Sequence, residues 1–104
     1  MQYGLKRSDL QILAQAKLDD AKILLQASSF SNAYYIAGYA VEIGLKACIA
    51  RQVTPETIPN KNFLQKVLNH EFMTLVSLAG LAVELKTKQD SDSSFSAHWA
   101  LVSE

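Results

Sequence analysis

The stretch Asn32–Ala50, NAYYIAGYAVEIGLKACIA, decides the fold of this chain. Its residues are apolar on almost every side of a helix, a pattern typical of a helix that other helices surround. One narrow stripe is the exception. At about 100° per residue, its four members fall within roughly 60° of one another: Tyr35, Tyr39, Glu42 and Lys46. We predict a central helix whose exposed surface is this stripe, and that a ligand or partner binds there.

Composition limits the class of protein. The chain has 104 residues, of which 49% are hydrophobic, which is enough for the core of one domain over residues 1–104. Ten basic and ten acidic side chains cancel, without a run of like charge, so no strong electrostatic attraction to nucleic acid or membrane is indicated. The single cysteine, Cys48, excludes an intrachain disulfide. Because there is also no signal-peptide pattern and no uncharged span of transmembrane length, we expect a soluble cytoplasmic protein that does not bind membranes.

The segment before the central stretch predicts a helix that pairs with it. Apolar residues recur at helical spacing over 10–25, after a sequence at Ser8 that fits a capping box. The turn Ser28–Ser31 is short, and either Ser31 or Asn32 is expected to cap the next helix. So short a connection predicts an antiparallel helical hairpin.

The segment after the central stretch predicts shorter helices. Pro55 and Pro59 indicate a loop, because each proline removes a backbone donor and restricts the residue before it. A short helix is expected over 62–68. Asn69 then fits the N-cap of a further helix that runs to about Gly80, and the apolar pattern continues from there to Lys86.

A polar break over 90–94 precedes a last amphipathic helix, which Asp92 or Ser93 is expected to cap. Its apolar period is still running at Glu104, so this helix is either truncated there or ends raggedly. With no strand pattern in the sequence, the predicted fold is all-α: an antiparallel up-down bundle of four to five helices.

Three parts of the sequence carry a resemblance to a known family. Residues Ala33–Ala47 read AYYIAGYAVEIGLKA, His70 and Phe72 open a later helix, and Phe95–Trp99 precedes the end. Together they resemble the HEPN domain family, whose members carry an Ala-Tyr-Tyr-x-Ala-Gly-Tyr-Ala-Val-Glu-x-x-Leu-Lys-Ala core. The resemblance implies a HEPN-like bundle that commonly forms homodimers. Known members include RNA-cleaving toxins encoded beside a small nucleotidyltransferase-like antitoxin, and also non-catalytic binding domains.

The ribonucleases of that family depend on an arginine followed, four to six residues later, by a histidine. RNA cleavage without metal needs a base for the 2′-hydroxyl and a fixed cation for the phosphate. Neither Arg7 nor Arg51 has a histidine at this spacing. We therefore expect no ribonuclease activity and predict a non-catalytic interaction module, or a module that binds nucleotides or RNA. The resemblance implies a homodimer, and a nucleotidyltransferase-like partner in a toxin–antitoxin system.

Six residues are candidate ligand contacts: Tyr35, Tyr39, Glu42, Lys46, Arg51 and His70. Each has another interpretation. The two charges on the stripe also suit an i,i+4 ion pair with a structural role or a role in a dimer interface. The tyrosines also suit a core or an interface in which their hydroxyls contact water. Lys46, Arg51 and His70 together would suit a phosphate, and an alternative hypothesis makes them the site of a toxin-type, metal-independent endoribonuclease. The sequence predicts no metal site and no cofactor.

Overall fold

The computed structural model describes residues 6–52, 60–68 and 70–103. These residues contain helices and no strand, so the all-α prediction is confirmed within them. The expected number of four to five helices is wrong, because the described residues form six. The helices are α1 Arg7–Gln26, α2 Phe30–Ala50, α3 Lys61–Val67, α4 Phe72–Leu78, α5 Ala82–Ser91 and α6 Ser93–Val102. The predicted proline loop, the predicted cap at Asn69 and the predicted end at Glu104 lie outside the described residues.

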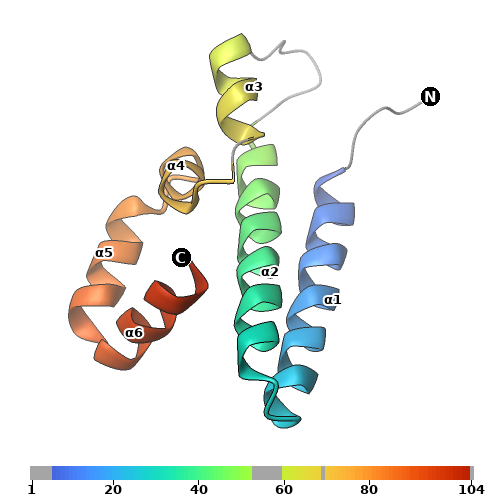
Figure 1. Ribbon diagram of the computed structural model, residues 1–104. Coiled ribbons are helices and arrows are strands. Elements are labelled where there is room, and N and C mark those ends of the chain that lie inside the picture. Colours follow the sequence, from blue (N-terminus) through green and yellow to red (C-terminus); the bar gives the residue numbers. More distant parts are fainter. Residues whose placement is uncertain (1–5, 53–59, 69, 104) are drawn as a thin grey trace.

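Helix α2 lies at the centre of the molecule (Figure 1). It runs antiparallel to α1 on one side and contacts α4 and α6 on the other. Between Ala33 and Ala50, Tyr35 and Tyr39 are the only exposed residues. The prediction of a central helix with a thin exposed stripe is thus confirmed at its tyrosine end. The charged end of the stripe is covered, since Glu42 is buried.

The turn between α1 and α2 is tight because Ser28 adopts the left-handed backbone conformation, with φ of 62°. The backbone N–H groups of Ser28 and Ser29 donate to carbonyl oxygens in the last turn of α1, at 3.0 and 2.9 Å. These bonds satisfy carbonyls that the helix end leaves free. Helix α2 consequently begins at Phe30 with Ser29 as its N-cap residue, earlier than the predicted caps at Ser31 or Asn32.

The N-terminal caps of the other helices are partly as expected. The carboxylate of Asp92 accepts a hydrogen bond from the backbone N–H of Phe95 at 3.0 Å, which confirms one of the two predicted caps of α6. The predicted capping box at Ser8 is wrong. The N-cap residue of α1 is Lys6, two residues before Ser8, and the Asp9 carboxylate accepts from the backbone N–H of Lys6 at 3.2 Å.

Gly80 follows α4, and the predicted end of that helix at about Gly80 is confirmed. Its φ of 76° lies in the region that favours glycine, and α4 ends just before it. The N–H groups of Gly80 and Leu81 donate to carbonyls of α4, each at 3.1 Å, which completes the usual hydrogen bonding of a glycine-terminated helix. The chain therefore changes direction, and α5 and α6 form a second pair that folds back toward α2 (Figure 1).

The buried core lies between the C-terminal half of α2 and α4. Its fully buried members are Ile49, Leu75 and Val76. Helix α6 joins this core through Trp99, whose ring meets that of Phe72 edge-on with centroids 5.8 Å apart. This contact brings the last turn of α6 toward α2, where the candidate site lies.

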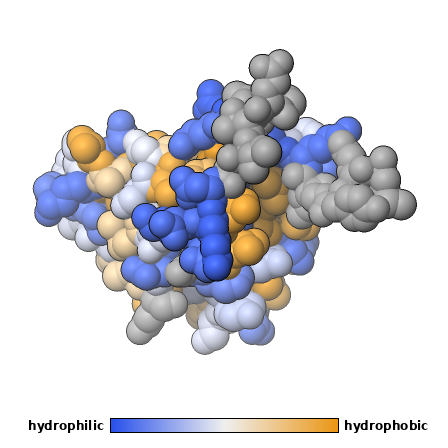
Figure 2. Space-filling model, turned by 90° about the horizontal axis from the view of Figure 1, so that it is seen from above, coloured by the Kyte–Doolittle hydropathy of each residue, from blue (hydrophilic) through white to orange (hydrophobic). Residues whose placement is uncertain are grey.

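Apolar side chains also reach the surface. Seen from above, hydrophobic residues surround a central group of hydrophilic ones (Figure 2). The large hydrophobic side chains that are most exposed belong to different elements, for example Ile12 on α1 and Val83 on α5. In the described part of the chain, none of the helices has the length and hydropathy needed to cross a membrane.

Candidate functional site: a groove beside α2

A groove of about 650 Å³ opens between α2, the beginning of α4 and the end of α6. Its described lining residues are Phe30, Ser31, Tyr34, Tyr35, Gly38, Tyr39, Glu42, His70, Phe72, Leu101 and Val102. Four of the six residues proposed from the sequence belong to this set. The groove is therefore built along the predicted stripe, with additional surface from two other helices.

A glycine of α2 brings the end of α6 against the groove. A Cβ atom at Gly38 would lie only 2.7 Å from the carbonyl oxygen of Val102, so the backbones of α2 and α6 meet closely here. One turn earlier, the ring of Tyr34 stacks on that of His98 with centroids 6.2 Å apart. These two contacts fix α6 as one boundary of the groove.

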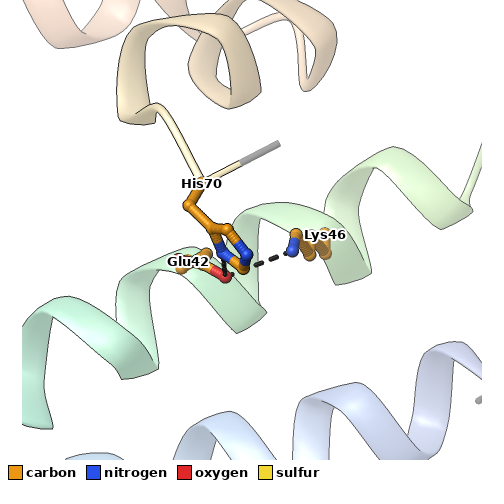
Figure 3. A network of polar contacts seen from close by, with 3 residues as sticks. All are labelled: Glu42, Lys46 and His70. Carbon is orange, nitrogen blue, oxygen red and sulfur yellow. Dashed lines mark hydrogen bonds and ion pairs between the residues drawn. The ribbon is translucent and has the colours of Figure 1, made fainter. Parts of the chain in front are cut away.

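A buried carboxylate connects α2 to the segment that precedes α4 (Figure 3). Oε2 of Glu42 accepts a hydrogen bond from Nζ of Lys46 at 3.1 Å, and Nδ1 of His70 lies 2.7 Å from the same oxygen. The side chain of Glu42 is 11% exposed, that of Lys46 19% and that of His70 77%. Partners of this kind are what a buried carboxylate requires, because an isolated buried charge is strongly unfavourable.

This contact assigns the hydrogen-bonding roles of the imidazole. An ionised carboxylate only accepts hydrogen bonds, so Nδ1 of His70 is the donor to Glu42. In the neutral ring, Nε2 then carries no hydrogen and is an acceptor. Because the ring is exposed and lines the groove, the neutral form of His70 offers this acceptor to a ligand.

The two predicted tyrosines lie at the surface of the groove. Tyr35 is 77% exposed and Tyr39 44%, so neither belongs to the core of this chain. Nζ of Lys17 on α1 lies 5.7 Å from the centroid of the Tyr39 ring, within the range of a cation–π contact. Tyr35 is thus the more accessible of the two rings.

Arg51 lies apart from the other candidates. It is the exposed C-cap residue of α2 and does not line the groove. Five residues of helix separate it from Lys46, which places the two side chains about 140° apart around the axis. Lys46 and His70 do come together, but both of them bind the Glu42 carboxylate.

Several lining residues were missed by sequence reasoning. Tyr34 precedes the stripe by one residue and so faces about 100° away from it, toward α6. Leu101 and Val102 come from the other end of the chain, and no local pattern indicates that they approach α2. Lys17 does not line the groove, but its contact with the ring of Tyr39 likewise depends on the packing of α1 against α2. Among the side chains that the structure describes, no group of three or more histidine, cysteine, aspartate or glutamate residues is placed to hold a metal ion.

Comparison of the chain with protein-family models, with curated proteins and with solved structures finds no match. The resemblance to the HEPN family therefore stays a prediction from the sequence motif at Ala33–Ala47 and the residues near it.

Proposed function

We propose that this chain is a non-catalytic, HEPN-like module that binds a nucleotide in the groove beside α2. The observation that carries the proposal is the arrangement of exposed tyrosine rings next to a histidine that a buried carboxylate orients. Small-molecule sites are typically concave and largely apolar, with a few fixed polar groups that orient the ligand. A nucleotide suits such a site, because its base has an apolar face for stacking and a polar edge for hydrogen bonds.

The proposal includes a homodimer, as the resemblance implies. Phe30 and Leu101 line the groove and are 56% and 51% exposed. Side chains this large and apolar at one groove are typical of a surface that a partner covers. A nucleotidyltransferase-like protein, acting with this chain as a toxin–antitoxin-type pair, is the second partner that the sequence motif suggests.

A binding experiment tests the central claim. The purified protein is titrated with each of the four ribonucleoside monophosphates and with a short single-stranded RNA by calorimetry. We expect saturable binding of at least one of them, and weaker binding by Tyr39→Ala. Val83→Ala is the matched control, because Val83 is 75% exposed on α5 and outside the groove. Absence of binding at millimolar ligand would refute the proposal.

The dimer is tested separately, by light scattering over a range of protein concentrations. A mass of twice the chain at micromolar concentration is expected. A mass of one chain throughout that range would remove this part of the proposal and leave nucleotide binding to be judged by the titration.

One observation favours a second candidate function, an endoribonuclease with an unusual site. A histidine held at 2.7 Å by a buried carboxylate has the arrangement of a general base. Nε2 of His70 would take the proton of a 2′-hydroxyl, the 2′-oxygen would attack the adjacent phosphorus, and the 5′-oxygen of the next nucleotide would leave with a proton. The products would be a 2′,3′-cyclic phosphate and a 5′-hydroxyl.

Incubation of labelled transfer and messenger RNA with the protein in EDTA distinguishes the two functions. Cleavage by the native protein that His70→Ala abolishes would establish the enzyme. Intact RNA with the native protein would exclude it and favour the binding module.

A further inference from the structure

We propose that the groove recognises its ligand through the base and not through the phosphate, an inference that rests on the proposed nucleotide-binding function. Three observations carry it: the charge of the groove lining, the accessible aromatic rings, and the acceptor that His70 offers. The ligand class is therefore a nucleoside or nucleobase. When a nucleotide binds, its phosphate is directed toward solvent.

The charge of the lining does not suit a phosphate. No lysine or arginine occurs among the described lining residues, and the ionised side chain among them is the carboxylate of Glu42. Phosphate sites in proteins use arginine or lysine side chains in direct contact. Two cations lie beside the groove and are already engaged: Lys46 with the Glu42 carboxylate at 3.1 Å, and Lys17 with the face of the Tyr39 ring, 5.7 Å from its centroid. A phosphate placed beside His70 would thus lie next to the carboxylate of Glu42. Lys46 would not be available to bind the phosphate, because it already pairs with that carboxylate.

The first turn of α2 is the other place where an anion would be favoured, because backbone N–H groups are free there. Ser31 lines the groove at that end. Eleven residues of helix separate it from Glu42, a distance of about 16 Å. The two ends of the groove are thus too far apart for one mononucleotide to use both His70 and the helix start.

The aromatic lining suits a base. Tyr34, Tyr35, Tyr39 and Phe72 all border the groove. Tyr35 has the most accessible ring, and its loss is not expected to disturb the core, since it is 77% exposed. Removing one stacking partner is expected to weaken binding about tenfold.

The imidazole of His70 supplies a polar contact for the edge of the base. When the ring is neutral and its Nδ1–H donates to Glu42 at 2.7 Å, Nε2 accepts from a ligand N–H group. Amino and imino N–H groups are present on the edges of nucleobases, whereas a phosphate at neutral pH offers oxygens that mainly accept. The orientation of this ring thus favours the base over the phosphate as the group beside it.

The test compares ligands that separate the two parts of a nucleotide. Nucleosides, their 5′-monophosphates, ribose 5-phosphate and inorganic phosphate are titrated into the dimeric or monomeric protein as purified, at low and at high salt. We expect each binding nucleoside to match its monophosphate within about threefold, with little effect of salt, because stacking is not screened as phosphate contacts are. Ribose 5-phosphate and inorganic phosphate are expected not to compete.

Variants at Tyr35 and His70 add a matched control. Tyr35→Ala is expected to weaken nucleoside binding about tenfold, whereas Tyr35→Phe keeps the ring and is expected to bind as the native protein does. His70→Phe keeps an aromatic ring and removes the acceptor, so it should also weaken binding. Circular dichroism of each variant checks that the helices are intact.

The outcomes separate this inference from the function on which it rests. Binding of monophosphates with competition by ribose 5-phosphate and no binding of nucleosides would overturn the inference and leave the nucleotide-binding function standing. Binding of neither nucleosides nor monophosphates would overturn both. Equal binding by Tyr35→Ala and the native protein would also overturn the inference, because the base would then not be held at this ring.

Discussion

Replacing Gly38 by alanine tests whether α6 packs against α2 as the structure has it. The new Cβ would stand 2.7 Å from the carbonyl oxygen of Val102, which is a backbone atom and moves only if the last turn of α6 moves. Forcing extra volume into packed structure costs about 1–3 kcal/mol. Alanine is also better than glycine inside a helix by about 0.8–1.0 kcal/mol, which offsets part of that cost. The net expectation ranges from no change to a loss of about 2 kcal/mol.

Gly44 provides the matched control on the same helix. A Cβ there would meet nothing within 4 Å, so Gly44→Ala gains the helix propensity of alanine without a steric clash. We expect it to raise the free energy of unfolding by about 0.8–1.0 kcal/mol. The difference between the two variants then isolates the approach of α6 and should be about 1–3 kcal/mol.

Urea unfolding followed by circular dichroism measures both variants, with thermal unfolding as a check. For a domain of this size, 1 kcal/mol corresponds to about 4–8 °C in Tm. If Gly38→Ala is as stable as Gly44→Ala, the end of α6 does not lie on α2, and the groove loses one of its boundaries. If Gly44→Ala lowers the free energy of unfolding, α1 lies closer to α2 than the structure shows.

Three further predictions concern stability. Leu75→Ala should lower the free energy of unfolding by about 2–5 kcal/mol, because the leucine is 0% exposed and a cavity would remain; a loss below 1 kcal/mol in urea would contradict its place in the core. Ser28→Gly should raise stability by about 0.5–1 kcal/mol, since glycine adopts the φ of 62° without strain; a lower urea midpoint would show that this turn is not left-handed. The backbone N–H of Phe95 holds the pKa of the Asp92 carboxyl below its usual range. A carboxyl with a depressed pKa in the folded state stabilises above its unfolded pKa, and this stabilisation disappears as pH falls through the folded value. Asp92→Asn, which keeps a capping oxygen, should therefore lose less Tm between pH 7 and pH 3 than the native protein, and an equal loss would contradict the cap.

The helices were predictable where their determinants are local. The spacing of apolar residues located α1, α2 and α6, because the pattern repeats with every turn of a helix. The end of α4 near Gly80 was predicted, but the apolar pattern did not show that a separate helix with another direction follows it. Leu81 and Val83 continue the apolar period beyond it, but in the structure they are 37% and 75% exposed. A glycine tolerated within a helix and a glycine that ends one look alike in sequence, and the backbone conformation decides between them.

The candidate site was predictable along one helix and not across helices. Glu42 and Lys46 pair as the i,i+4 rule requires. His70 reaches the same carboxylate from 28 positions away, and its role in orienting a polar group at the groove follows only from the fold. Arg51 was grouped with these residues because it is near them in sequence, whereas helical geometry directs it elsewhere.

We predict that the Glu42–Lys46 pair is not needed for a stable core, and a double variant tests whether its role is functional or structural. Replacing a buried ion pair by apolar residues of similar size is often neutral or stabilising, because the desolvation cost of both charges disappears. The double variant Glu42→Leu/Lys46→Met leaves no unpaired charge, and His70 is exposed enough to remain hydrated without its partner. We expect its free energy of unfolding to stay within about 1 kcal/mol of native, or to rise, while nucleoside binding weakens because the imidazole is no longer oriented. A loss of more than about 3 kcal/mol in urea together with unchanged binding would instead make the pair a structural element of α2.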